Sequence, residues 1–380
     1  MTLTARTGDT GLVQASSEVA ELATQWAASA DETGRLEQQA VDAVVSAGFA
    51  RHFVPTRWGG HGGTFTAWKR AVAQVGASCG ATAWTASLAA GVGRMAGYLP
   101  LDGQRDVWGD GPDALVVASF TPAGTAERVA GGWRLSGQWR FVSSVEYADW
   151  ALVLAPSIDG RRFFAIPRAD YSVRETWSNL GMRATGSDTL VVDDVVVPDS
   201  RSCLRADLNE GTPMASTERC HRVRLKAVTG LMFAAPMLGA AQGVLRESVS
   251  ESRRHVGSST LSATQLAAHR LAVARSSAAI DAARLLLDRV ANTADEDLEY
   301  TDLRVAQDCR DTAFAAELLC EATDRLIRVA GTGAFAGDRP VQRFWRDVQT
   351  SASHAALRFA DRAEAYADLI WESSGQEGEL

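Results

Sequence analysis

Residues 118–145 read ASFTPAGTAERVAGGWRLSGQWRFVSSV, and this stretch decides the fold. A turn containing proline and glycine precedes two segments in which apolar and polar residues alternate, and Gly131 and Gly132 separate these segments. Alternation with a period of two indicates strands, and a glycine pair between them indicates a hairpin. The stretch therefore predicts antiparallel β-structure in the middle of the chain.

More strands are expected on both sides of this hairpin. Runs of β-branched and aromatic residues recur at 114–120, 148–156, 161–167 and 189–198. Short strands at such close spacing are typical of an all-β barrel or sandwich. We therefore predict a central β-domain over residues 116–224.

The flanking regions have the periodicity of helices. Apolar residues recur at helical spacing over 16–48, where Asp31 is available as a cap between two helices, and again over 65–78 and 81–99. These segments predict an N-terminal helical domain over residues 1–115.

Four longer periodic segments follow the β-region. They cover residues 226–255, 261–292, 300–330 and 339–373. Long helices with short connections form antiparallel bundles. The predicted fold class is therefore α+β with several domains, in which a four-helix bundle over residues 225–380 completes the chain.

Composition excludes several classes of partner. The formal net charge of −8 argues against a nucleic-acid-binding surface and against adhesion to an anionic membrane. The five cysteines are scattered without CxxC spacing, so neither a disulfide framework nor a metal site is indicated. No targeting segment and no uncharged apolar run of about 18 residues is recognised. We expect a cytoplasmic protein that binds neither nucleic acid nor membrane.

Three segments, in the same order, resemble motifs of the acyl-CoA dehydrogenase superfamily. Residues 118–153 are similar to its flavin-binding β-domain, 180–198 (LGMRATGSDTLVVDDVVVP) to its G-M-R-x-T-x-S segment, and 329–347 (VAGTGAFAGDRPVQRFWRD) to its R-x-x-R-D segment. Three ordered matches spread over most of the chain make the resemblance specific. It implies the same order of domains as the periodicity does.

The resemblance also implies a flavin site. The residues that it assigns to the cofactor are Phe120, Thr121, Phe141, Val142, Ser143, Arg253, Gly331, Thr332 and Gly333. The Phe141 ring would pack beside the isoalloxazine, the Ser143 hydroxyl would reach its N5/O4 edge, and Arg253 would hold a phosphate. The small residues of the FTPAG turn, 120–124, would let the backbone approach a planar ligand. The glycine-rich segment 331–333 matches the loop by which a neighbouring subunit covers the adenine half, which implies a homotetramer.

One segment departs from the dehydrogenases. Those enzymes remove a thioester α-proton with a carboxylate, but residues 346–357 (RDVQTSASHAAL) contain no acid beyond Asp347. The aligned position is Ala355, next to His354, and the alternative position for the base reads Arg254–His255. This combination resembles the group D flavin-dependent monooxygenases.

The monooxygenase resemblance implies a different chemistry. A separate flavin reductase supplies reduced FAD or FMN by diffusion, O₂ adds at C4a, and the hydroperoxide passes one oxygen atom to the substrate. Such a species survives only where water is excluded. We assign proton management to His354, whose ordinary pKa lies near neutrality, and name Ser143 as a second catalytic residue. Trp84 and Trp139 are candidate walls of the substrate site, for which core packing is the alternative.

Within this branch, the segments 48–60, 80–90 and 139–150 resemble the nitrososynthases. The resemblance implies oxidation of the amine of a TDP-linked amino sugar to a hydroxylamine or nitroso product in secondary metabolism. A nucleoside diphosphate needs cations, for which Arg57, Arg140 and Arg183 are candidates, and we assign Arg183 to substrate binding.

Three other functions stay open. The same flavin chemistry could hydroxylate an aromatic or polyketide substrate. An acyl-CoA dehydrogenase could use Glu247 or Glu251 as its base, and a non-catalytic protein could merely store flavin. No motif of a serine hydrolase, zinc protease, P-loop enzyme or Rossmann dehydrogenase is recognised.

Overall fold

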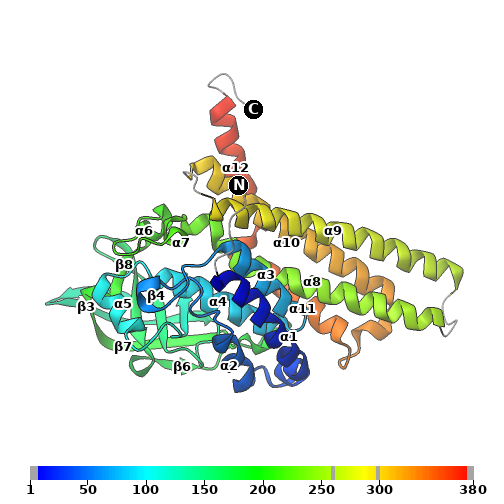
Figure 1. Cartoon of the computed structure of the whole chain (residues 1–380), viewed down its shortest axis with the longest axis horizontal. Helices are drawn as coiled ribbons and strands as arrows, with labels where there is room; N and C mark the ends of the chain where they lie inside the picture. The colour runs from blue at the N-terminus through cyan, green and yellow to red at the C-terminus, as the bar shows by residue number, and fades with distance from the viewer. Residues whose placement is uncertain (1–6, 258–261, 297–299, 375–380) are drawn as a thin grey trace.

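The computed structural model describes residues 7–257, 262–296 and 300–374. Figure 1 shows a β-rich end, a central helical body and a rod of long helices that extends away from the strands. The described chain runs from helices through strands to helices, which is the order predicted from the sequence.

Helices form the N-terminal part. In the described chain they are α1 (Thr7–Thr33), α2 (Gln38–Ser46), α3 (Phe65–Gly76), α4 (Gly80–Ala96) and α5 (Leu101–Trp108). Every residue of α4 is buried, which explains its many alanines, since small side chains let neighbours pack on every side. The predicted capping role of Asp31 is wrong. It lies inside α1, and its carboxylate accepts hydrogen bonds of 2.5 and 3.1 Å from Arg346.

The strands form a sandwich of two sheets. They are β1 (Val116–Ser119), β2 (Thr125–Val129), β3 (Gly132–Val142), β4 (Trp150–Ser157), β5 (Gly160–Pro167), β6 (Ser172–Arg174), β7 (Asp188–Pro198) and β8 (Ser202–Leu204). The orders are β1-β4-β5-β8 and β2-β3-β7-β6, and only the β1–β4 pair is parallel among the described pairs. Alternate residues such as Trp133, Leu135 and Phe164 fill the space between the sheets.

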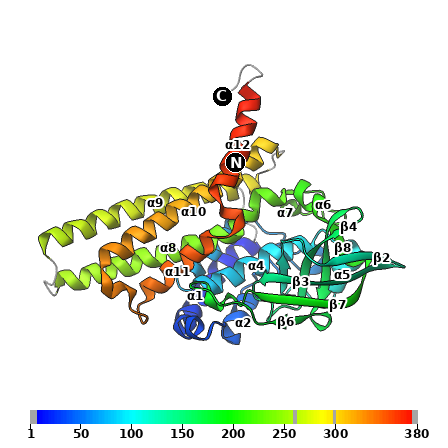
Figure 2. The same ribbon diagram turned by 180° about the vertical axis from the view of Figure 1, so that it is seen from behind.

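The C-terminal part is helical. Its described helices are α6 (Arg205–Glu210), α7 (Arg219–Arg222), α8 (Leu225–Gly257), α9 (Ala263–Asp295), α10 (Asp302–Ala330), α11 (Pro340–Ala352) and α12 (Phe359–Ser374). The prediction of one continuous helix over 339–373 is wrong. The chain turns between α11 and α12, where His354 is extended, and α12 stands away from the rod in both views (Figures 1 and 2).

Helix α8 is the central pole of the helical body. It is long and apolar enough to cross a membrane, but most of it is buried against α3, α4, α9, α10 and α11, so it is a core helix. A Cβ on Gly239 would clash with the carbonyl oxygen of Ala73, so glycine is required where α8 crosses α3. The close crossing fixes α4, beside α3, relative to the bundle.

We expect Asp308→Asn to stabilise the protein, relative to the parent, increasingly as the pH rises. Asp308 on α10 is fully buried, and neither of its oxygens accepts a hydrogen bond from a residue that the structure describes. Burial raises the pKa of Asp308 to about 7, against a partial opposing effect of Arg304. A carboxyl with a raised pKa in the folded state destabilises the fold increasingly as pH rises from about 4 to about 7.

Urea unfolding at pH 5 and pH 8 measures this effect. The stability of Asp308→Asn relative to the parent should increase by roughly 2 kcal/mol between these pH values. Asp281→Asn, on the exposed face of α9, is the matched control and should show no such trend. Equal pH trends for the two variants would contradict the prediction.

Candidate active site

Aromatic side chains from three helical elements meet beside the β-domain. Phe233 of α8 stacks on the His354 ring with centroids 3.6 Å apart, and Trp84 of α4 lies 5.1 Å from Phe233 and 6.2 Å from His354. Phe120, which follows β1, meets Phe233 edge to face at 6.4 Å. The predicted residues Trp84, Phe120 and His354 are therefore brought together, and Phe233 completes the cluster.

A chain of buried hydroxyls lies next to this cluster. The Trp84 indole N–H donates to Ser143 Oγ at 3.1 Å, and Ser143 Oγ lies 2.7 Å from Ser187 Oγ. Ser187 Oγ lies 2.8 Å from Thr185 Oγ1, which donates to the Met182 carbonyl at 2.8 Å. The predicted catalytic Ser143 is thus one end of a polar chain whose other members the sequence analysis did not single out.

The backbone on both sides of Ser143, which follows β3, is unusual. Phe141 and Ser144 have φ values of 62° and 60°, a region that L-residues rarely adopt outside functional or strained sites. A register shift between Trp139 and Val142 accompanies this geometry. As a result the Phe141 ring turns outward and is 61% exposed, whereas Val142 and Ser143 stay buried.

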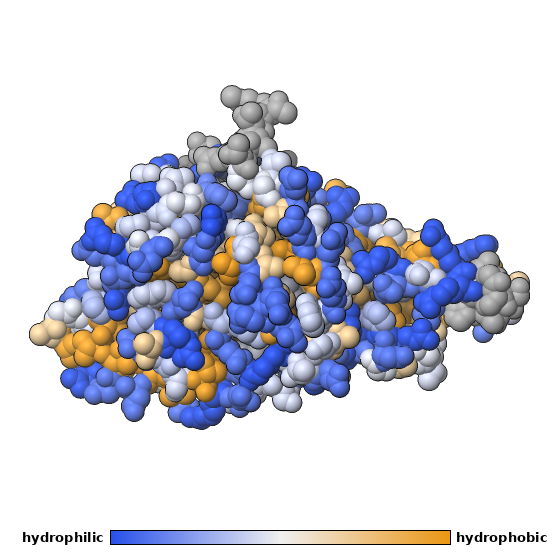
Figure 3. Space-filling model, turned by 60° about the horizontal axis from the view of Figure 1, so that its bottom comes forward, coloured by the Kyte–Doolittle hydropathy of each residue, from blue (hydrophilic) through white to orange (hydrophobic). Residues whose placement is uncertain are grey.

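Apolar surface gathers on the β-domain, which also carries the exposed Phe141. Figure 3 shows that orange surface gathers at the end occupied by the strands, while most of the rod is hydrophilic. Phe141 on β3 and Val196 on β7 are large exposed apolar side chains of this part. The Trp177 ring meets Phe141 edge to face at 6.3 Å, and the Arg140 guanidinium lies 5.0 Å from the centre of the Phe141 ring.

Helix α11 holds the loop that carries the hydroxyls. Asp347 accepts the Met182 N–H at 2.6 Å, and Thr350 accepts the Gly181 N–H at 3.1 Å. Arg346 donates to the Leu180 carbonyl at 2.5 Å. Burial raises the pKa of Asp347 to about 6, although the Met182 hydrogen bond favours its ionised form.

The environment of His354 restricts what its ring can do. Its Nδ1 accepts the Ala356 N–H at 3.1 Å, so the proton of the neutral ring lies on Nε2. Burial lowers the pKa of His354 to about 4, and the positive charges of Arg362 and Arg358 lower it further. Near neutral pH the ring is therefore an uncharged N–H donor, and not the titrating group that its ordinary pKa predicted.

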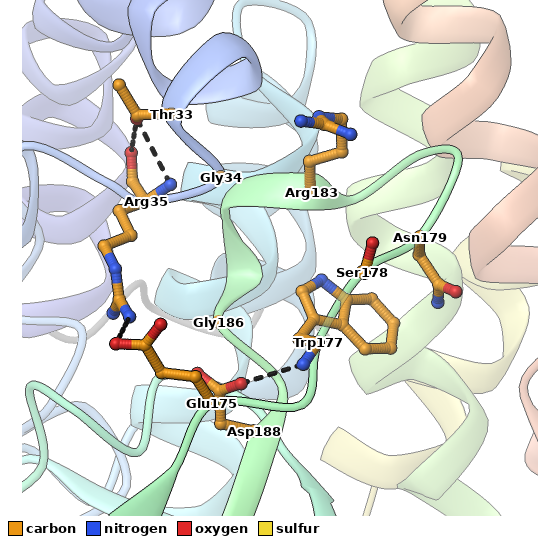
Figure 4. A pocket seen from close by; sticks show the side chains of 10 residues that line it. All are labelled: Thr33, Gly34, Arg35, Glu175, Trp177, Ser178, Asn179, Arg183, Gly186 and Asp188. Atoms are coloured by element: carbon orange, nitrogen blue, oxygen red, sulfur yellow. Dashed lines mark hydrogen bonds and ion pairs between the residues drawn. The ribbon is translucent and has the colours of Figure 1, made fainter.

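A cavity of about 150 Å³ opens beside the same loop (Figure 4). Its lining includes Gly34, Arg35, Trp177, Arg183 and Asp188. The prediction that Arg183 binds a diphosphate conflicts with its contacts. Its guanidinium donates to the Asp31 carbonyl at 2.6 Å and to the Glu32 carbonyl at 3.4 Å, and so it caps the end of α1.

Two further predictions are corrected by packing. Trp139 is 1% exposed inside the sandwich, and its N–H donates to the Leu154 carbonyl at 2.8 Å, so it packs the β-core and lines no substrate site. The FTPAG turn needs its glycine for a different reason from the one predicted. Gly124 has a φ of 71°, and a Cβ there would approach the Ser136 carbonyl of β3, so the close approach is within the β-domain. Thr121 in the same turn is exposed.

The residues assigned to the outer half of the flavin lie on the rod. Arg253 is 20 positions beyond Phe233 on α8, which corresponds to roughly 30 Å along a helix. It lines a groove of about 520 Å³ with Leu245, Arg246 and Val249. Gly331 ends α10, and Thr332 and Gly333 start the short helix Thr332–Phe335, exposed between α10 and α11. Within one chain these residues are not brought to the aromatic cluster.

Comparison with known proteins gives the family. A family model described as "Acyl-CoA dehydrogenase, C-terminal domain" matches residues 231–359. The oxygenase subunit HsaA of a flavin-dependent monooxygenase from Rhodococcus jostii is 31% identical over 345 residues, which cover 86% of this chain and 89% of HsaA. The oxygenase component of an FADH(2)-dependent resorcinol hydroxylase from Rhizobium sp. is 30% identical over 366 residues, covering 90% and 89%. The chain belongs to the oxygenase subunits of flavin-dependent monooxygenases.

Solved structures agree with this family. The 3-HSA hydroxylase from Rhodococcus sp. RHA1 superposes with a TM-score of 0.88 at 27% identity, covering 95% of this chain and 97% of the hydroxylase. XiaF from Streptomyces sp., solved with FADH2 and glycerol, gives a TM-score of 0.86 at 25% identity, covering 96% of each chain. The predicted three-part fold is confirmed. So is the cofactor of this oxygenase subunit, which is reduced flavin, as FADH2 or FMN, supplied by a separate reductase.

The finer resemblance to nitrososynthases is not supported. KijD3, solved in complex with dTDP, shares the fold with a TM-score of 0.76, but its identity of 19% carries no statement about substrate. The two relatives with 30% identity or more described above are a flavin-dependent monooxygenase subunit and a resorcinol hydroxylase. Hydroxylation, the alternative left open by the sequence, agrees better with these relatives.

We predict a catalytic role for the His354 ring, and His354→Asn should separate this role from the structural one. Asparagine keeps an oxygen near the position of Nδ1 for the Ala356 N–H but removes the Nε2–H edge. Product formation should fall by about 10²-fold or more, while the free energy of unfolding changes by no more than about 1 kcal/mol. His354→Gln is the matched variant. Its side-chain amide places an N–H donor near the position of Nε2 but does not accept the Ala356 N–H.

The pH dependence provides a second check. With a pKa of about 4, His354 should produce no inflection in the product-formation rate between about pH 5.5 and pH 8. An inflection near pH 6.5 that disappears in His354→Asn would show that the ring titrates during turnover, contrary to this expectation.

Proposed function

We propose that this oxygenase subunit hydroxylates a phenolic aromatic substrate. The observation that carries the proposal is the cluster of Trp84, Phe233 and His354, in which apolar rings surround a single neutral N–H donor. A phenol would pack against the rings, and its oxygen would accept the Nε2–H bond of His354. Such a bond stabilises negative charge on the phenol oxygen, and this charge makes the ring carbons better nucleophiles toward an electrophilic oxygen atom.

The residues beside the cluster suit the isoalloxazine of the flavin. The exposed Phe141 ring offers an apolar face, and Phe120 and Thr121 lie at the exposed end of β1. The Ser143 hydroxyl would face the polar edge of the ring system, whereas Val142 packs its side chain inside the sandwich and could contribute only its backbone. When bound, reduced flavin activates O₂ so that one oxygen atom passes to the substrate. The protein side chains hold the reactants, exclude water and position the proton on His354 Nε2.

We further propose a homotetramer in which a second copy completes the flavin site. Arg253 lies roughly 30 Å along α8 from Phe233, and the segment 331–333 lies exposed between α10 and α11. The same residues of a neighbouring chain would then cover the outer half of FAD. Because the family consists of oxygenase components, the second partner is a flavin reductase, which would deliver reduced flavin by diffusion.

Isotope labelling tests the substrate class. Protein supplied with photoreduced FAD under ¹⁸O₂ is incubated in parallel with resorcinol, 4-hydroxyphenylacetate and a TDP-linked amino sugar. We expect ¹⁸O in a ring-hydroxylated product, and loss of this product in His354→Asn. Label in an N-hydroxylated sugar with none in any phenol would overturn the proposal in favour of amino-sugar oxidation.

Phe141→Ala should weaken flavin binding with little effect on stability. The ring is exposed and separate from the sandwich core, so its removal leaves no cavity, whereas a bound isoalloxazine would lose a stacking partner. We expect the dissociation constant of reduced FAD, measured anaerobically by fluorescence, to rise about tenfold. Val196→Ala removes an exposed apolar side chain of β7 and serves as the control. Equal affinities of the two variants would exclude Phe141 from the flavin site.

A further inference from the structure

The neighbours of Ser143 decide whether its hydroxyl can donate or accept one more hydrogen bond. Its hydroxyl has one proton and two lone pairs, and the Trp84 N–H occupies one lone pair. The 2.7 Å contact with Ser187 occupies either the proton or the second lone pair. The remaining proton or lone pair is the one that a ligand could use. Ser143 therefore presents an acceptor when its proton points to Ser187, and a donor when Ser187 points its proton to Ser143.

The row of hydroxyls can donate in either of two directions, or senses, and the contact of Thr185 with Met182 favours one of them. Thr185 donates its only hydroxyl proton to the Met182 carbonyl, which can only accept. The contact between Thr185 and Ser187 must then contain the proton of Ser187, and the contact between Ser187 and Ser143 must contain the proton of Ser143. In this sense Ser143 keeps a lone pair that a ligand could use.

The opposite sense is also accessible. The Met182 carbonyl additionally accepts the Trp177 indole N–H at 3.0 Å and the Thr185 backbone N–H at 3.2 Å. It is therefore not left without a partner when the Thr185 hydroxyl turns to Ser187. Ser187 then donates to Ser143, whose own proton is the one that a ligand could use. The change is a rotation of three hydroxyl groups, in which every proton stays on its own oxygen.

The three hydroxyls are shielded from solvent. Exchange with water therefore does not randomise the direction in which their protons point. Ser143, Ser187 and Thr185 are 8%, 5% and 1% exposed. The loop that carries Thr185 and Ser187 is held by the bond from Met182 to Asp347. Each contact between two hydroxyls contains one proton, so the senses of neighbouring hydroxyls are coupled.

We propose that Thr185 and Ser187 are positioning residues that let the Ser143 hydroxyl bind both redox forms of the flavin. The inference rests on the proposed function, because it places Ser143 at the N5 edge. Reduced flavin carries a proton on N5 and requires an acceptor there, whereas N5 of oxidised flavin is a bare lone pair and requires a donor. The reversible row of hydroxyls supplies either group from one side chain, and the direction favoured by the Thr185–Met182 bond suits the reduced form.

Thr185→Val tests the chain at its far end, two hydroxyls from Ser143. Valine keeps the shape but removes the group that accepts from Ser187, so the acceptor sense leaves a buried hydroxyl proton without a partner. We expect the dissociation constant of FADH2, measured anaerobically, to rise about tenfold relative to that of oxidised FAD. The reduction potential of bound FAD should fall accordingly. Thr185→Ser should restore the parent ratio, and Ser187→Ala should behave like Thr185→Val.

Thr85→Val is the matched control. Thr85 is also a buried threonine beside the site, but its hydroxyl bonds to Ser144 at 2.8 Å and is not part of the chain. The inference is overturned if Thr185→Val changes the ratio of the two dissociation constants no more than Thr85→Val does. Ser143→Ala separates this failure from failure of the flavin site itself. It should weaken the binding of both redox forms, and if it changes neither, Ser143 does not face the flavin.

Discussion

The geometry of the site depends on one buried carboxylate, that of Asp347. It accepts the Met182 N–H and so attaches helix α11 to the loop that carries Ser187. A Cβ on Gly80 would lie 2.8 Å from its Oδ2, so the same carboxylate also lies against the start of α4. Since α11 leads directly to His354, a single helix fixes the hydroxyl chain, the base of the Trp84 helix and the histidine. Burial opposes ionisation of Asp347, and the hydrogen bond from Met182 partly offsets this cost.

Near Asp347, the polar atoms of the aromatic residues form hydrogen bonds with other groups of the protein. The Trp84 N–H binds Ser143, and Nδ1 of His354 binds Ala356, which leaves the ring faces and one imidazole N–H for a ligand. The break between α11 and α12 is what makes this possible, because a continuous helix would use the Ala356 N–H in its own ladder. The hydrogen bond from Ala356 to Nδ1 therefore both caps the short helix after His354 and places the ring proton on Nε2.

The sequence predicted the order of the parts well, because period-two alternation and helical periodicity are local signals. Prediction from the sequence failed where tertiary contacts or a shift in strand register determine the position of a side chain. Trp133, Leu135 and Trp139 have the same parity, which could have placed Trp139 in the core. Phe141 continues that parity, yet the bulge after Trp139 turns it outward. Arg183 is a helix cap only because α1 ends beside it, and Phe233 lies in an apolar run that reads as core, so neither role has a local signal.

The two arginines that line the cavity of Figure 4 are already used within the protein. Burying phosphate charges is costly unless cations compensate them. Around the cavity of Figure 4, Arg35 is paired with Glu146 and Glu175, and Arg183 is used by helix carbonyls, so recruiting either would break an existing interaction. His354 is uncharged near neutral pH. A phenol requires only the donor and apolar surfaces that are present. Its binding therefore needs no rearrangement of ion pairs, and for this reason the local chemistry agrees with hydroxylation more closely than with oxidation of a nucleotide-linked amine.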